Sequence, residues 1–121
     1  MLFDATQQVS PVTQDYLKAI WQSTEWGGRP ATTSSLAARF GTSQANVSDV
    51  LSRLTKAQLV VREPYRPCAL TPRGVALALG MVRRHRLIET HLVESLGYAC
   101  TEVHEDAERL EHAASDVFID R

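Results

Sequence analysis

Residues 34–63 read SSLAARFGTSQANVSDVLSRLTKAQLVVRE, and they contain two short helical patterns separated by a glycine. The first pattern predicts a helix at about 33–40, and Gly41 suits the left-handed backbone that commonly ends a helix. The second predicts a helix at about 44–57, and its apolar stripe consists of Val47, Val50, Leu51 and Leu54. Two short helices joined by a turn that contains glycine predict a helix-turn-helix.

Two β-prone runs follow this motif, at 59–62 and 68–71, and a proline-rich turn at 64–67 separates them. Short β-prone runs joined by turn residues predict a β-hairpin, which is a wing when it follows a helix-turn-helix directly. Ahead of the motif, residues 13–25 have apolar side chains at helical spacing and predict an amphipathic helix. The first part of the chain is therefore expected to be a winged helix-turn-helix.

The remainder of the sequence is predicted to be helical. Thr71 suits an N-cap and Pro72 a first helical position, at the start of a long helix that runs to about Leu96. A last helix is expected after Thr101, which would cap it. Its predicted apolar stripe consists of Val103, Ala107, Leu110, Ala114, Val117 and Phe118. This helix would keep an apolar face to the last residues of the sequence.

The expected fold is mainly α-helical with a small β-hairpin wing. Residues 1–75 are predicted to form a winged helix-turn-helix DNA-binding domain, and residues 76–121 a second, helical domain. No run approaches the roughly 18 apolar residues of a transmembrane helix, and the N-terminus does not resemble a signal peptide, so no membrane partner is expected. Cys68 and Cys100 form no CxxC pair, which indicates a reduced, cytoplasmic protein.

The charge of the chain is unevenly distributed along the sequence. The 121 residues carry a formal net charge of −1. Residues 1–90 hold 11 Lys and Arg against 6 Asp and Glu, a net +5, whereas residues 91–121 hold 2 against 8, a net −6. A basic front part and an acidic tail suggest two kinds of partner, a polyanion and a cation.

The helix-turn-helix pattern supplies candidate DNA-binding residues. The second helix of such a motif enters the major groove, where its first side chains reach base edges. Those positions are Ser43, Gln44, Ala45, Asn46, Ser48 and Asp49. Phosphate contacts are expected from the end of that helix and from the wing, at Arg53, Lys56, Arg62 and Arg66. Asp49 suits this interpretation only if it accepts from a cytosine amino group, because a carboxylate repels phosphate.

Histidines and glutamates at helical spacing make a second constellation. The last predicted helix carries His104, Glu108, Glu111 and His112 at i, i+4, i+7 and i+8, a spacing that places them along one face. The long helix before it carries His85 and Glu89 at i and i+4. Carboxylates with imidazoles suit divalent manganese, iron, zinc, cobalt or nickel. A solvated polar face is the alternative reading of each pair.

These residues also carry a resemblance to a known family. Residues 81–116, MVRRHRLIETHLVESLGYACTEVHEDAERLEHAASD, resemble the second domain of the diphtheria-toxin-repressor family. Residues 12–21, VTQDYLKAIW, and residues 34–63 resemble its winged helix-turn-helix domain. The resemblance implies a homodimeric transcriptional repressor that binds operator DNA when loaded with Mn(II) or Fe(II) and controls metal-homeostasis genes. It also implies that residues 76–121 form a metal-binding and dimerisation domain.

The resemblance assigns metal ligands position by position. A primary site would be formed by Asp15, Glu108, Glu111 and His112, and an ancillary site by His85, Glu89 and His104. Asp and Glu at 15 and 108 resemble the manganese-responsive branch, because the iron-responsive branch has Met and Cys there. Lys18 departs from manganese regulators that place a further Glu ligand at this position, and His104 resembles the iron branch. The sequence also stops before the SH3-like third domain that many members carry.

The predicted ligands suggest how a metal would control DNA binding. Asp15 belongs to the predicted DNA-binding domain, whereas the other ligands belong to the second, so that a bound metal would favour one relative orientation of the two. In a symmetric dimer this orientation would set the spacing of the two recognition helices.

Two alternative functions remain open. One is a winged-helix regulator with an organic effector or no metal dependence, and the other is a small metalloenzyme whose Glu and His cluster activates water.

Overall fold

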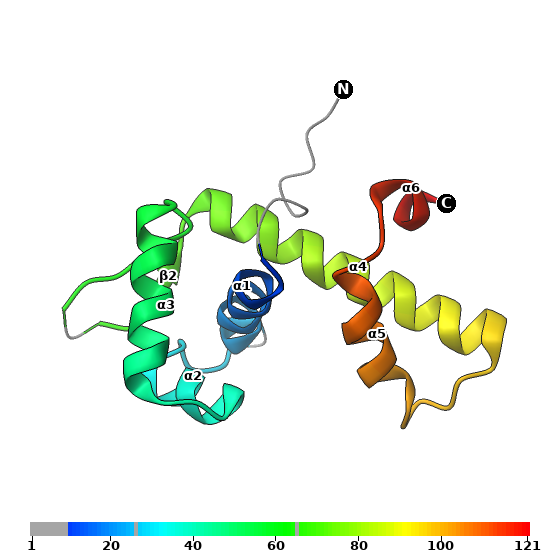
Figure 1. The fold of residues 1–121 in the computed structure, drawn as a ribbon, viewed down its shortest axis with the longest axis horizontal. Coiled ribbons are helices and arrows are strands. Elements are labelled where there is room, and N and C mark those ends of the chain that lie inside the picture. The colour runs from blue at the N-terminus through cyan, green and yellow to red at the C-terminus, as the bar shows by residue number, and fades with distance from the viewer. Residues whose placement is uncertain (1–9, 26, 65) are drawn as a thin grey trace. The chain divides into compact units, whose positions relative to one another are not determined.

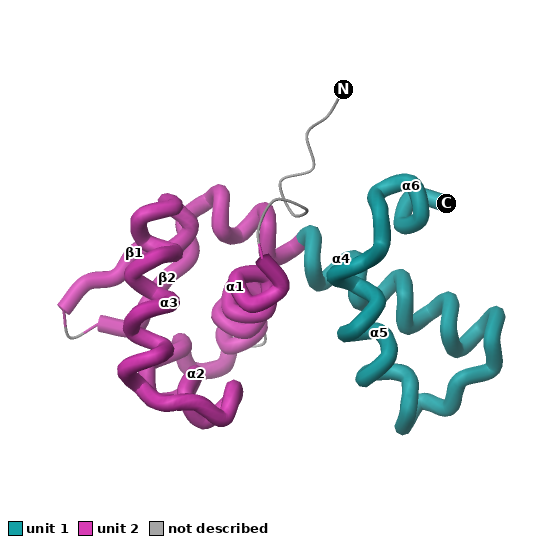
Figure 2. Tube along the Cα trace, in the orientation of Figure 1, with its two compact units in different colours: residues 1–9, 80–121 teal, residues 10–79 magenta. Residues whose placement is uncertain are grey.

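The computed structural model describes residues 10–25, 27–64 and 66–121. Helices dominate this part of the chain, and its single described sheet has two strands (Figure 1). The described residues form two compact units, Ser10–Leu79 and Gly80–Arg121, and the helix α4 (Pro72–Leu96) runs through both (Figure 2). The mainly α-helical class with a small hairpin is therefore confirmed. The sequence-based domain boundary after residue 75 falls inside α4 and stays a prediction.

The unit Ser10–Leu79 begins with α1 (Pro11–Thr24), α2 (Thr33–Phe40) and α3 (Gln44–Lys56). Each helix starts at a hydroxyl side chain that accepts a hydrogen bond from a first-turn amide, and these N-caps are Ser10, Thr32 and Ser43. Such caps satisfy amides that have no partner inside the helix. The two short helices of the predicted helix-turn-helix are confirmed at 33–40 and 44–56.

Gly41 makes the turn between α2 and α3. Its φ angle of +61° is left-handed, and its amide returns to the carbonyls of Ala37 and Ala38. The α3 side chains Val47, Val50, Leu51 and Leu54 are all buried, as their spacing predicted. On the other side of the core, Tyr16 of α1 stacks on Phe40 of α2 with ring centroids 4.5 Å apart. The turn and this shared core fix α3 against the rest of its unit.

The wing follows α3 directly. Its strands β1 (Val60–Val61) and β2 (Ala69–Leu70) are antiparallel, with Val60 opposite Leu70 and Val61 opposite Ala69. The Thr71 hydroxyl donates to the Gln58 carbonyl at 2.7 Å and accepts from the Gly74 amide at 3.0 Å, so that one side chain both closes the base of the wing and caps α4. A Cβ at Gly74 would lie 2.1 Å from the Leu59 carbonyl oxygen, so this close approach needs glycine.

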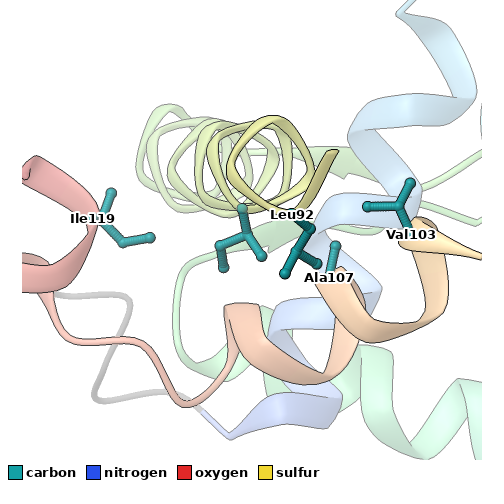
Figure 3. Close-up of a cluster of buried hydrophobic side chains, with 5 residues drawn as sticks. Leu92, Val103, Ala107 and Ile119 are labelled. Atoms are coloured by element: carbon teal, nitrogen blue, oxygen red, sulfur yellow. The ribbon is translucent and has the colours of Figure 1, made fainter. Parts of the chain in front are cut away.

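The unit Gly80–Arg121 contains the remainder of α4, then α5 (Val103–Glu111) and α6 (Asp116–Asp120). Gly97, with φ at +74°, follows the end of α4 as predicted. Side chains of all three helices meet in one apolar core (Figure 3). The buried members are Ile88, Leu92, Val103, Ala107 and Ile119. Figure 3 shows Leu92 of α4 facing Ala107 of α5, with Ile119 reaching the cluster from α6.

The prediction of one continuous last helix is wrong. The chain leaves α5 after Glu111 and begins α6 at Asp116, where the Ser115 hydroxyl accepts from the Phe118 amide. A side-chain cap competes with continued helix, which is why serine interrupts the pattern here. Thr101 is not the cap of α5 either, because Glu102 precedes this helix and no side-chain hydrogen bond caps it.

The predicted apolar stripe is wrong in part. Val103 and Ala107 are buried, but Leu110, Val117 and Phe118 are 43%, 64% and 56% exposed. Ile119, which the helical spacing left out, enters the core in their place. Among the described residues, no helix combines the length and the apolar character needed to cross a membrane.

Candidate metal centre and nucleic-acid interface

His85 and Glu111 form the buried centre of the histidine and glutamate cluster. His85 lies on α4 and Glu111 is the last residue of α5, in line with the buried Ala107 and Val103 one and two turns earlier. The two side chains are 7% and 1% exposed, and His85 Nδ1 lies 2.8 Å from Glu111 Oε2. An ionised carboxylate can only accept, so this hydrogen bond forms when Nδ1 carries a proton. This hydrogen bond orients the imidazole and leaves Nε2 directed away from Glu111.

His85 Nε2 faces two further polar side chains. It pairs with Glu89 Oε1 one helical turn along α4, and it lies 3.0 Å from His104 Nδ1 on α5. His104 Nδ1 is also 3.1 Å from Glu89 Oε1. One ligand atom from each of the three residues lies within 4.8 Å of the other two. Two imidazoles and a carboxylate converging in this way suit a divalent transition metal, with Glu111 as the carboxylate that orients a ligating histidine.

The electrostatics of the cluster favour an ionised carboxylate at Glu89. Burial alone would raise its pKa, but the hydrogen bond from His104 and the charge of His85 outweigh burial and lower that pKa. Glu108 lies on the exposed side of α5, with Oε1 3.1 Å from His104 Nε2. The structure therefore brings five of the predicted ligands together within one unit, and these are His85, Glu89, His104, Glu108 and Glu111.

His112 belongs to the same unit as these five residues, and Asp15 belongs to the unit Ser10–Leu79. α5 ends at Glu111, and His112 is its C-cap, where φ of −80° and ψ of −21° are still helical. His112 Nε2 is 3.8 Å from Glu111 Oε1, so the pair stays together. Asp15 is a half-buried residue of α1 in the unit Ser10–Leu79, and Lys18 on the same helix is buried. The primary set of Asp15, Glu108, Glu111 and His112 stays a prediction.

One polar residue beside this cluster was missed by the sequence reasoning. Arg84, which precedes His85, is 5% exposed and binds the segment between α5 and α6 through Ala114 and Asp116. Arg84 lies three residues after Met81 and four before Ile88, so helical spacing places it on the buried face of α4. A charged residue on the apolar face of a helix is rarely unpaired, and this spacing could have predicted a buried partner for Arg84.

The predicted base-reading residues lie at the N-terminal end of α3. Ser43, Gln44, Ala45, Asn46 and Asp49 are exposed, and Ser48 is half-buried. Asn46 Nδ2 donates to the Thr42 hydroxyl at 3.1 Å, which orients its amide. The opposite side of the helix is buried in the core, so the face that carries these residues is the one that α3 offers to a partner.

The predicted phosphate contacts surround this face. Arg53 and Lys56 are exposed on the last turns of α3, and Arg62 and Arg66 are exposed in the wing. Arg62 Nη1 donates to the Ser48 carbonyl at 3.4 Å, which links the wing to α3. Arg66 pairs with Glu63 at 3.7 Å in an exposed ion pair that is worth little in water. Exposed cations on α3 and in the wing suit a nucleic-acid backbone.

Both parts of the chain match models of one protein family. Residues 8–68 match the N-terminal DNA-binding domain of the iron-dependent repressors, and residues 71–121 match the metal-binding and dimerisation domain of the same family. The two matches together cover nearly the whole chain.

Individual proteins agree with this assignment. The chain is 36% identical to the diphtheria toxin repressor of Corynebacterium efficiens over 86% of its own length and 45% of that protein. It is 46% identical to a manganese-dependent transcriptional repressor solved in complex with manganese, with a TM-score of 0.83 over 90% of this chain and 50% of that one. The zinc-bound structure of ScaR is 36% identical, with a TM-score of 0.77 over the same shares. The chain thus spans about half the length of these relatives.

Proposed function

The chain belongs to the iron-dependent repressor family, and from this we propose that it is a metal-dependent transcriptional repressor that binds operator DNA when loaded with Mn(II) or Fe(II). Its targets would be genes of metal homeostasis. The single observation that carries this proposal is the convergence of His85, Glu89 and His104, with Glu111 behind them, in the same chain as an exposed recognition helix. The family is one of repressors, so the metalloenzyme alternative is set aside.

Manganese is the metal that we propose first. The predicted primary ligands Asp15, Glu108, Glu111 and His112 include three carboxylates and no sulfur, and hard oxygen ligands suit Mn(II). The similarity to a manganese-dependent repressor supports the same choice. Fe(II) is second, and Zn(II), Co(II) and Ni(II) are expected to bind in vitro because the same donor types accept them. A bound metal would supply charge that holds carboxylates and imidazoles in one arrangement.

The proposed DNA contacts divide by chemistry. Base edges would be read by Ser43, Gln44, Ala45, Asn46, Ser48 and Asp49, and phosphates would be bound by Arg53, Lys56, Arg62 and Arg66. The exposure of all but the half-buried Ser48 supports this assignment. We also propose that the protein acts in the cytoplasm as a homodimer, which the dimerisation domain of its family supports. A dimer would present two recognition helices to a two-fold symmetric operator.

The experiment is a DNA titration that compares metals in parallel. An operator would first be selected from random duplexes in the presence of Mn(II), and its binding measured by fluorescence anisotropy with Mn(II), Fe(II), Zn(II) or a chelator. Tight binding with Mn(II) and loss of binding with the chelator are expected. Equal binding in all lanes would support the alternative of a winged-helix regulator with an organic effector or none, and would defeat the metal-dependent function.

Matched arginine variants test the DNA face in the same assay. Arg53→Ala removes an exposed cation from α3 and should weaken operator binding by roughly fivefold to tenfold, since one phosphate contact is lost. Arg109→Ala removes an equally exposed arginine from α5, which pairs with Glu105 at 3.3 Å. Operator affinity should be unchanged in that control. If both substitutions weakened binding equally, the loss would reflect total charge and not the α3 face.

A further inference from the structure

A buried arginine, next to His85 in the sequence, links α4 to α6. Arg84 is 5% exposed, and its guanidinium donates from Nη1 to the Ala114 carbonyl at 2.5 Å and from Nη2 to the Asp116 carboxylate. Ala114 belongs to the turn that follows α5, and Asp116 is the first residue of α6. The planar fork of arginine suits two acceptors at fixed positions, which a lysine cannot bind at once.

Arg84 and His85 hold the two ends of one short segment. His85 Nδ1 binds Glu111 at the end of α5, and Arg84 binds Ala114 and Asp116 a few residues further on. His112 lies between these two anchor points. His112 is the C-cap of α5, and the helix does not continue beyond it. The backbone that follows His112 is held by hydrogen bonds from the Ala113 and Ala114 amides to the Leu110 carbonyl. It is also held by the hydrogen bond from Arg84 to the Ala114 carbonyl.

Arg84 is a charged residue in a buried position, and such a residue needs a partner of opposite charge. A buried guanidinium is costly unless acceptors, above all a carboxylate, replace its lost hydration. Asp116 supplies that carboxylate, and its side chain is 49% exposed while that of Arg84 is 6% exposed. The neighbouring Arg83 pairs with Asp120 at 3.5 Å, but both of these side chains are largely exposed. Arg84 therefore makes the buried link to α6, and Arg83 makes an exposed one.

We propose that Arg84 is a positioning residue for the metal site, and that metal binding and the docking of α6 stabilise each other through it. Arg84 holds the segment that carries Glu111 and His112 in the conformation that a metal ion requires. A metal bound to those residues in turn holds the acceptors of Arg84 in place, so α6 docks more tightly, as linkage demands. This inference rests on the proposed function, because it requires that Glu111 and His112 bind a metal.

The test measures Mn(II) binding to the full chain by titration calorimetry, at a temperature where circular dichroism shows every variant folded. Arg84→Ala should weaken binding by about tenfold to a hundredfold, the range found when residues that support metal ligands are removed. Arg84→Lys, which can reach one acceptor at a time, should recover part of this loss. Arg83→Ala removes the adjacent, exposed arginine and should leave the dissociation constant within about twofold of the wild type.

Hydrogen exchange supplies a second readout that does not depend on affinity. The Ile119 amide of α6 donates to the Ser115 carbonyl at 3.1 Å and reports the docking of this helix. Saturating Mn(II) should slow the exchange of α6 amides in the wild type and in Arg83→Ala. In Arg84→Ala, saturated at a higher Mn(II) concentration, the slowing should be lost. A merely structural arginine would change exchange equally with and without metal.

The results distinguish failure of the proposed function from failure of the proposed role of Arg84. Failure of the wild type to bind Mn(II) would defeat the proposed function itself. Mn(II) binding by folded Arg84→Ala at wild-type affinity would overturn the positioning role and leave the function intact. If Arg84→Ala does not fold, Asp116→Asn replaces it, since this change keeps the bond to Ala114 and removes only the charged acceptor. Intermediate weakening of Mn(II) binding is then expected, and unchanged affinity would overturn the inference.

Discussion

His85 Nδ1 and Glu111 Oε2 lie 2.8 Å apart in the interior of the unit Gly80–Arg121, although one residue comes from α4 and the other from the end of α5. A buried carboxylate is costly unless a donor satisfies it, and His85 is that donor. The same hydrogen bond directs Nε2 toward Glu89 and His104. The candidate metal cluster is therefore built on a buried residue pair.

Removal of the buried carboxylate should destabilise the metal-free protein. Glu111→Ala leaves His85 without this partner and creates a small cavity, so the free energy of unfolding should fall by about 1–3 kcal/mol. Denaturation in urea with a chelator present measures this. Glu108→Ala, on the exposed side of the same helix, should cost less than about 0.5 kcal/mol. Equal losses in the two variants would show that burial of Glu111 is not what stabilises this unit.

A methyl group at Gly74 should destabilise the base of the wing. The new Cβ would lie 2.1 Å from the Leu59 carbonyl oxygen, so α4 or the chain before β1 must shift, at about 1–3 kcal/mol. Thermal unfolding of Gly74→Ala measures the cost. Ala76→Ser, at an exposed position two residues along the same helix, serves as the control and should be nearly neutral. A wild-type midpoint for Gly74→Ala would contradict the close approach.

Substitution of Asp15 should uncouple DNA binding from metal. As a proposed primary ligand, Asp15 is not needed for the recognition face itself, so Asp15→Ala should keep weak, metal-independent DNA binding. The gain in operator affinity that Mn(II) produces should shrink by about tenfold or more, the scale on which metal sites respond to lost supporting groups. Anisotropy titrations with Mn(II) and with chelator give that ratio directly.

Asp49→Asn is the matched control for Asp15→Ala. It changes a proposed base-reading side chain of α3 and no proposed metal ligand, and so should change DNA affinity by the same factor with and without metal. The ratio between the two conditions should stay at its wild-type value. Full metal dependence in Asp15→Ala would exclude Asp15 as a ligand.

Small-angle scattering with and without Mn(II) tests whether the metal changes the relative orientation of the two domains, as proposed.

The two cysteines should differ strongly in reactivity. Burial is the main factor that raises the pKa of the Cys68 thiol, which is 7% exposed and donates to the Ala31 carbonyl at 3.4 Å. Cys100 is exposed. A thiol reagent at pH 8 should therefore modify one thiol quickly and the second only after unfolding. Cys100→Ser should abolish the fast phase, and a fast phase that persisted in this variant would mean that Cys68 is accessible.

The sequence predicted the first unit well because its signals are local. Gly41, the Ser43 cap and the proline-rich turn each act within a few residues, and the structure has the helices and the hairpin where these signals placed them. The apolar stripe of α3 has one buried face, so its spacing alone identified Val47 and Leu51 as core residues. Sequence patterns predict a helix or strand correctly where residues within or next to that element determine its ends.

The second unit was predicted less well because its turn depends on distant residues. Helical spacing continues past Glu111, but the Ser115 cap and the bond from Arg84 to the Ala114 carbonyl stop the helix. Arg84 comes from α4, some thirty residues earlier, and a periodic pattern cannot report such a contact. The grouping of His85, Glu89 and His104 was suggested by spacing and resemblance together, and their role as ligands stays a prediction.

The hydroxyl of Thr71 has a consequence for how this protein can change over evolutionary time. Because Thr71 and Gly74 fix the base of the wing from outside the hairpin, the outer residues Glu63, Pro64 and Arg66 contribute exposed side chains and little to the fold. Insertions and substitutions at the wing tip should therefore be tolerated. A lineage could acquire a new DNA preference there while the proposed metal response, encoded elsewhere in the chain, is inherited intact.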